Sequence, residues 1–204
     1  MRLPRPFALS AIVCTMVALV LAALILRPVM VANSLRNEML EFIEGPFSEQ
    51  RLREWAARHA ATLKCDGTTC EADATVYNWP LHVFGLAPET RFNAEIDTNH
   101  GNLAQTVLNL SNISYSDKPK GAATMLLVHF TRDGDTESKV GAHGVHVGQE
   151  PIGKLPTVVY SVDLNAAPHN LALAYDINVW CLARIGGCTG PQQAPEVWTL
   201  RRRK

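Results

Sequence analysis

The stretch FALSAIVCTMVALVLAALIL, residues 7 to 26, decides how the rest of the chain can fold. It holds twenty residues without a charge. A helix of this length spans about 30 Å, the thickness of the hydrocarbon core of a bilayer. We therefore expect a transmembrane signal-anchor helix over residues 7–27, with residues 1–6 on one side of the membrane and the remainder on the other.

A cleaved signal peptide is the alternative interpretation of this run. Such a peptide has a shorter apolar region, about 7–15 residues, followed closely by a cleavage site between small residues. Here Arg27 and Pro28 follow the run directly, and a weak cleavage pattern, Ala32-Asn33-Ser34, lies six residues beyond its end. The longer run and the late pattern favour the uncleaved anchor.

Basic residues near the run indicate its orientation. Arg2, Arg5 and the amino terminus precede it, whereas Arg27 and Arg36 follow it. Because Lys and Arg are retained on the cytoplasmic side, this margin favours a cytoplasmic N-terminus and an extracytoplasmic C-terminal part. The formal net charge is zero, so we expect no general attraction to nucleic acid.

Cysteine usage agrees with export. Cys14 lies inside the apolar run, and the other four, Cys65, Cys70, Cys181 and Cys188, all follow it. An even number of cysteines in an oxidising compartment predicts two disulfides, in any of three pairings.

The spacing favours local pairs. The segment Cys65 to Cys70 contains the turn residues Asp66-Gly67, and Cys181 to Cys188 contains Gly186-Gly187. A turn brings the two ends of a segment within the distance that a disulfide requires. Pairing across the chain remains open at this stage. Zinc sites use tighter pairs of cysteines and thiol oxidoreductases use C-x-x-C, so we expect neither a metal nor a cofactor.

The remaining pattern is helical first and β-like afterwards. Apolar residues recur at helical spacing up to Leu63, with Ser48 as the cap of a second helix after Gly45-Pro46, which predicts a helical stalk and a packing helix over residues 28–64. Alternation of period two follows, with turn signals between the strands. We expect an extracytoplasmic β-rich domain over 65–204, built as an antiparallel β-sandwich or a curved sheet.

Seven strands and one short helix are expected in that domain. The strands cover about 74–79, 91–97, 104–115, 122–132, 139–147, 157–163 and a stretch from about 170, and the last gives way to a short helix near Asn178.

Catalytic motifs of the common hydrolases and phosphate-binding enzymes are missing from the sequence. Catalytic groups can still assemble from scattered positions. The alternative to a binding protein is therefore an extracytoplasmic enzyme, hydrolytic in the simplest case, that uses His129, His143, His146 and Asp163.

The first functional expectation is a binding or interaction module. In general layout the chain resembles small single-pass proteins of bacterial envelopes, with an anchor and a disulfide-stapled exported domain. This expectation implies an exposed apolar or aromatic patch, for which Trp79, His82 and Phe84 are the candidates. Its partner would be another envelope protein, a saccharide or a lipid, besides the bilayer that holds residues 7–27.

Overall fold

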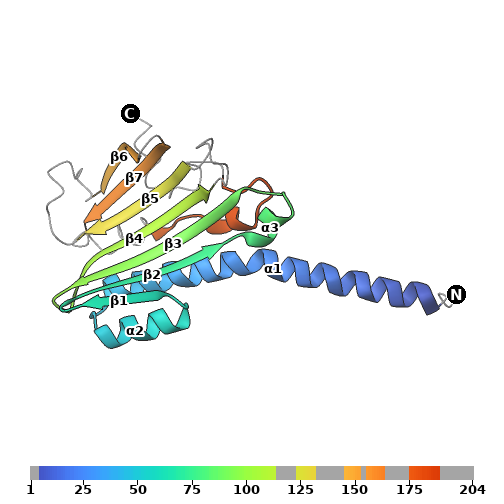
Figure 1. The fold of residues 1–204 in the computed structure, drawn as a ribbon, viewed down its shortest axis with the longest axis horizontal. Helices are drawn as coiled ribbons and strands as arrows, with labels where there is room; N and C mark the ends of the chain where they lie inside the picture. Colours follow the sequence, from blue (N-terminus) through green and yellow to red (C-terminus); the bar gives the residue numbers. More distant parts are fainter. Residues whose placement is uncertain (1–4, 114–122, 132–144, 153–154, 164–174, 189–204) are drawn as a thin grey trace.

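The computed structural model describes residues 5–113, 123–131, 145–152, 155–163 and 175–188. The longest element is helix α1 (Arg5–Glu44), whose 40 residues continue through Pro28. Its first half projects away from the other elements (Figure 1) and exposes large apolar side chains such as Ile12 and Leu19.

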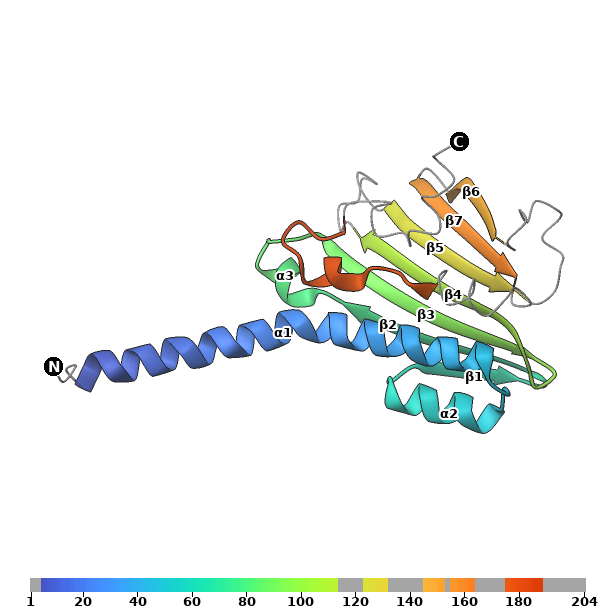
Figure 2. The same cartoon turned by 180° about the vertical axis from the view of Figure 1, so that it is seen from behind.

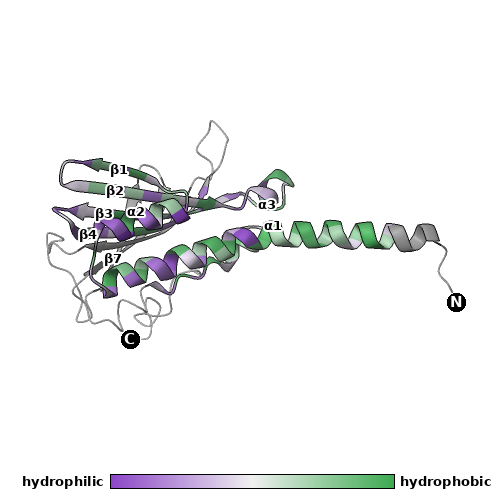
Figure 3. Cartoon of the chain, turned by 90° about the horizontal axis from the view of Figure 1, so that it is seen from below, coloured by the Kyte–Doolittle hydropathy of each residue, from purple (hydrophilic) through white to green (hydrophobic). Residues whose placement is uncertain are grey.

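The second half of α1 belongs to the core of the folded head. Its buried side chains recur every three or four residues, as expected for one face of a helix: Val29, Ala32, Leu35, Met39 and Phe42. Figure 3 shows the change from an apolar first half to a second half that alternates polar and apolar residues. The expected anchor and stalk are thus one helix.

Helix α2 (Glu49–Arg58) follows the break at Gly45-Pro46, as predicted. The side chain of Ser48 caps it by accepting a hydrogen bond from the backbone N–H of Arg51 at 3.3 Å. The prediction that helical structure extends to Leu63 is wrong. Helix α2 ends at Arg58, and the chain turns at Ala60, which has a φ of 50°.

The strands form one sheet in the order β1-β2-β3-β4-β5-β7-β6. Their bounds are β1 (Thr62–Asp66), β2 (Thr69–Tyr77), β3 (Glu89–Asn99), β4 (Asn102–Ile113), β5 (Ala123–Thr131), β6 (Val145–Ile152) and β7 (Leu155–Asp163). Neighbours are antiparallel except β5 and β7, which are parallel. The expectation of a purely antiparallel sheet is therefore wrong at this pair, because the β6–β7 hairpin joins the sheet through β7.

Helices supply the second layer of the head. Every second residue of β2, β3 and β4 is buried on one face of the sheet, and α1 packs against this face (Figure 2). Examples of these buried residues are Ala74, Phe92, Ala94 and Leu108. Small alanines on the strands allow the helix to approach the sheet closely. Because all described strands belong to this one sheet, two packed sheets are not seen among them, and a helix takes the place that a second sheet has in a sandwich.

Two shorter elements lie beside α1. Helix α3 (Trp79–Val83) connects β2 with β3, and the 3-10 helix η1 (Val179–Ala183) lies along α1 (Figure 2). The short helix expected near Asn178 is confirmed, with Asn178 as its cap. The strand expected to extend through Trp79 ends at Tyr77, because Pro80 occupies the start of a helix, where a missing N–H costs nothing.

Candidate interaction surface

Both disulfides are local. Cys65 and Cys70 face each other across the β1–β2 hairpin with 4.0 Å between their Cα atoms. Cys181 and Cys188 are 4.8 Å apart at Cα, and the chain between them reverses at Gly186 and Gly187, whose φ angles are 85° and 68°. Glycine is the residue that adopts such angles without strain. The spacing argument for local pairs therefore agrees with the structure.

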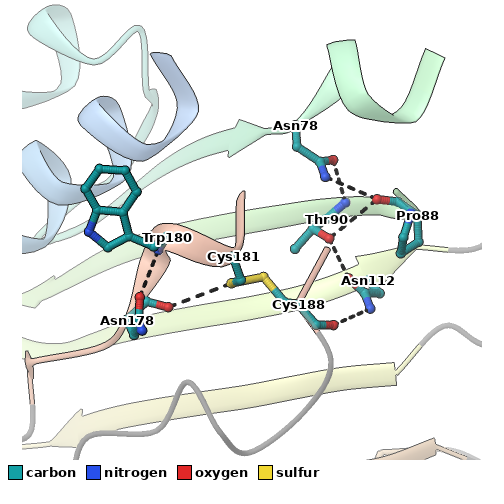
Figure 4. Close-up of a disulfide and its surroundings, with 8 residues drawn as sticks. All are labelled: Asn78, Pro88, Thr90, Asn112, Asn178, Trp180, Cys181 and Cys188. Carbon is teal, nitrogen blue, oxygen red and sulfur yellow. Dashed lines mark hydrogen bonds between the residues drawn. A yellow bond between two sulfur atoms is a disulfide. The ribbon is translucent and has the colours of Figure 1, made fainter. Parts of the chain in front are cut away.

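A buried polar network holds the C-terminal disulfide loop to the end of the sheet (Figure 4). The side-chain oxygen of Asn78 accepts a hydrogen bond from the backbone N–H of Thr90 at 2.8 Å, and its amide donates to the carbonyl of Pro88 at 3.2 Å. Thr90 pairs with Asn112 through a hydroxyl–amide contact of 2.5 Å, and Asn112 donates to the carbonyl of Cys188 at 2.8 Å. The network joins α3, β3, β4 and the disulfide loop into one unit.

Exposed apolar side chains gather on this unit. They come from α3, from the turn that follows it and from the disulfide loop, and we call them the end patch: Trp79 (46% exposed), Val83 (67%), Phe84 (59%), Leu86 (43%) and Ile185 (71%). The backbone N–H of Gly186 donates to the carbonyl of Leu86 at 2.9 Å, which brings the two loops together.

Of the three patch residues expected from the sequence, Trp79 and Phe84 belong to the end patch, whereas His82 is half-buried. Val83, Leu86 and Ile185 were not expected from the sequence. For Leu86 and Ile185 a signal was present, because each stands beside a glycine, Gly85 or Gly186, in a turn, where burial is uncommon.

The end patch lies at the end of the head from which the first half of α1 emerges (Figures 1 and 2). Contacts with the head bury Pro28 and Val29 and already half-bury Leu24 and Ile25. The head therefore begins to cover α1 before the apolar run ends at Leu26.

The opposite face of the sheet is polar and carries paired carboxylates. Glu71 stands opposite Asp97, and Asp73 stands opposite Glu95, on β2 and β3. Burial raises the pKa of both Asp73 and Glu95, and nearby carboxylates raise them further. Like charges directly opposite each other destabilise a strand pair, so this face carries a cost that the buried face does not.

The carboxylate of Glu38, by contrast, is stabilised in its ionised form by its neighbours. Glu38 of α1 accepts hydrogen bonds from Arg58 at 2.8 Å and from Ser34 at 2.9 Å, and it lies 3.0 Å from His59. Burial alone would raise the pKa of Glu38, but these partners outweigh it and hold that pKa below its usual value. The cluster fixes α2 against α1.

Three of the four residues expected for an enzyme, His129, His146 and Asp163, lie on the neighbouring strands β5, β6 and β7. His129 on β5 and His146 on β6 are both register partners of Ser161 on β7. Asp163 stands opposite Thr131, two residues beyond Ser161 on the same strand. His143 lies outside the described residues. The sequence did not indicate that Ser161 lies in register with both histidines, because no local pattern shows that β7 lies between β5 and β6.

Within the described part of the chain, one group of three potential metal ligands comes together, Glu49 with Cys65 and Cys70. The two cysteines are joined in a disulfide, and a disulfide offers no thiolate to a metal. This group therefore does not form a zinc site as it stands.

By length and composition, α1 is able to cross a membrane, although a signal sequence near an N-terminus would meet the same criteria. The disulfides indicate an oxidising compartment. Comparisons with protein-family models, with curated proteins and with solved structures find no match.

Proposed function

We propose that the chain is a single-pass membrane protein whose extracytoplasmic head is an interaction module of the cell envelope. Residues 1–6 are cytoplasmic, residues 7–27 span the bilayer, and the disulfide-stapled domain lies outside. Its partner is another envelope protein, a saccharide or a lipid.

One observation carries the proposal. Helix α1 has exposed apolar side chains in its first half and supplies buried core residues such as Leu35 and Met39 in its second half. An exposed apolar surface of this size is unfavourable in water, and a bilayer removes that cost. Because the same helix forms the core of the head, the head is held directly against the membrane with no flexible linker between them.

The topology can be tested by labelling cysteines in intact cells. We would replace Cys14 by alanine and introduce Thr75→Cys on the open face of the sheet, where Thr75 is exposed. A membrane-impermeant maleimide should label this variant without permeabilisation. The matched variant Leu3→Cys should react only after permeabilisation.

Two outcomes would contradict the topology. Labelling of Leu3→Cys in intact cells would show that the N-terminus lies outside, which is the opposite orientation. Release of the full chain from membranes by alkaline extraction would show that residues 7–27 do not remain as an anchor.

A second candidate function is an extracytoplasmic hydrolase, supported by the register of β5, β7 and β6. This register places His129, Ser161 and His146 at successive positions across three neighbouring strands. A serine beside a histidine is the combination required of an activated nucleophile and its general base.

A fluorophosphonate probe tests this second function directly, because it reacts with activated serines. The full chain should become labelled, and Ser161→Ala should abolish the labelling. His129→Ala and His146→Ala should each slow it if that histidine acts as the base. A chain that does not react with the probe would remove the hydrolase from consideration without affecting the membrane topology.

A further inference from the structure

The side chains of the end patch are exposed and take no part in the hydrophobic core of the head. These five side chains extend from α3 and from two turns, and each is at least 43% exposed. Isolated apolar residues on a surface are ordinary, but here four lie within residues 79–86 and the fifth, Ile185, precedes Gly186, whose N–H bonds to Leu86. Such a group, with a tryptophan and a phenylalanine, marks a surface that another phase or molecule covers.

The level of the end patch, beside the end of the apolar run in α1, identifies what covers the patch. The apolar run ends at Leu26, yet the head already half-buries Leu24 and Ile25. At 1.5 Å per residue, Leu24 is about 3 Å inside the end of that run. If the run fills the hydrocarbon core, the end of the head that bears α3 reaches the level of the lipid headgroups (Figure 1).

We propose that the end patch inserts into the boundary between headgroups and acyl chains of the same bilayer that α1 crosses. This inference rests on the proposed membrane topology and names a lipid surface as the partner of the patch. Tryptophan prefers this boundary because its ring is apolar and its N–H is polar. Arg27 directly follows the apolar run and Arg184 directly precedes Ile185; both are exposed and supply positive charge for anionic headgroups.

Hydrogen bonds and a disulfide tie the segments that carry the patch to the end of the sheet. The bonds from Asn78 to Thr90 and Pro88 fix the strand that follows α3, and the Gly186–Leu86 bond fixes the second turn. The Cys181–Cys188 disulfide closes the loop that carries Ile185. A surface held in this way loses little conformational entropy when it binds.

Tryptophan fluorescence in the full chain tests the proposal. The variant Trp180→Phe/Trp198→Phe retains Trp79 in the patch and Trp55, which is fully buried in the core. We would reconstitute it in vesicles of phosphatidylcholine and phosphatidylglycerol, with and without brominated acyl chains. Bromine quenches tryptophan at short range, so Trp79 should lose most of its emission, and Trp55 should keep most of its own.

A matched variant places the reporter at the other end of the sheet. In the same background, Trp79→Phe combined with Thr68→Trp moves the tryptophan to the exposed β1–β2 turn, far from α3 (Figure 1). Brominated lipid should leave this variant unquenched, and aqueous acrylamide should quench it strongly.

Two results for Trp79 would overturn the proposal. Quenching by acrylamide but not by brominated lipid would place the patch in water. Protection from both quenchers would mean that protein, either a second copy or a partner, covers it. Alkaline extraction of the same vesicles separates these results from failure of the topology. An extractable chain refutes the anchor itself, whereas a resistant chain with unquenched Trp79 refutes only the docking of the patch.

Discussion

Replacement of Asn78 by alanine should weaken the head more than any surface substitution of similar size. Asn78 is buried, and its side chain joins the end of β2 to the start of β3. Alanine removes both side-chain hydrogen bonds and keeps the backbone bond from the N–H of residue 78 to the carbonyl of Thr90.

The size of the effect follows from the two groups that lose a partner. The N–H of Thr90, a fully buried residue, would lose its acceptor, and an unsatisfied buried donor costs about 1–3 kcal/mol. Pro88 is an exposed residue, so the loss of the amide donor to its carbonyl is nearer the net value of one ordinary bond, about 1 kcal/mol. Together these give about 2–4 kcal/mol.

Urea unfolding of the full chain in detergent micelles, followed by near-ultraviolet circular dichroism, measures this loss. Asn93→Ala is the matched control, because Asn93 accepts its bond from Thr75 on the exposed face of the sheet. The control should change the unfolding free energy by less than about 0.5 kcal/mol. If Asn78→Ala changes the unfolding free energy as little as Asn93→Ala does, the polar network does not hold the end of the sheet or the end patch in place.

Three further predictions concern other parts of the head. Replacing Cys181 and Cys188 together by alanine should lower the unfolding free energy by about 2–2.5 kcal/mol, the value expected for so short a loop, and an unchanged urea midpoint would contradict this. Leu35→Ala should cost about 2–5 kcal/mol, since Leu35 is fully buried, whereas exposed Met30→Ala in the same helix should cost under about 0.5 kcal/mol by the same assay. Burial raises the pKa of Asp73, so its ionised form opposes folding at neutral pH; Asp73→Asn should raise the unfolding midpoint at pH 7, and this gain should vanish below about pH 3, where the carboxyl is protonated in both states.

Features set by neighbouring residues could be predicted from the sequence. The cap at Ser48, the helix near Asn178 and the reversal between Cys181 and Cys188 all depend on a few adjacent side chains. The His100-Gly101 turn between β3 and β4 is of the same kind, with φ angles of 50° and 75°. Such features follow from local backbone preferences, which the sequence expresses directly.

Features set by distant residues could not be predicted in this way. The parallel pairing of β5 with β7 depends on which hairpin edge joins the sheet, and no local pattern expresses that choice. Helix α3 was missed because proline ends a strand but also begins a helix. The end patch was anticipated only at Trp79 and Phe84, since Ile185 reaches it through the disulfide loop.

The unbroken path of α1 has a mechanical consequence. A helix of 40 residues is about 60 Å long, and nearly half of it is packed against the sheet. In a bilayer, a tilt of about 20°, average for a membrane span, would be passed to the sheet through this continuous helix. Pro28, which removes one backbone hydrogen bond inside α1, is the position where bending would reduce that transfer. A change in bilayer thickness that alters this tilt would therefore move the turn between β1 and β2, at the end of the sheet away from α3, relative to the membrane surface (Figure 1).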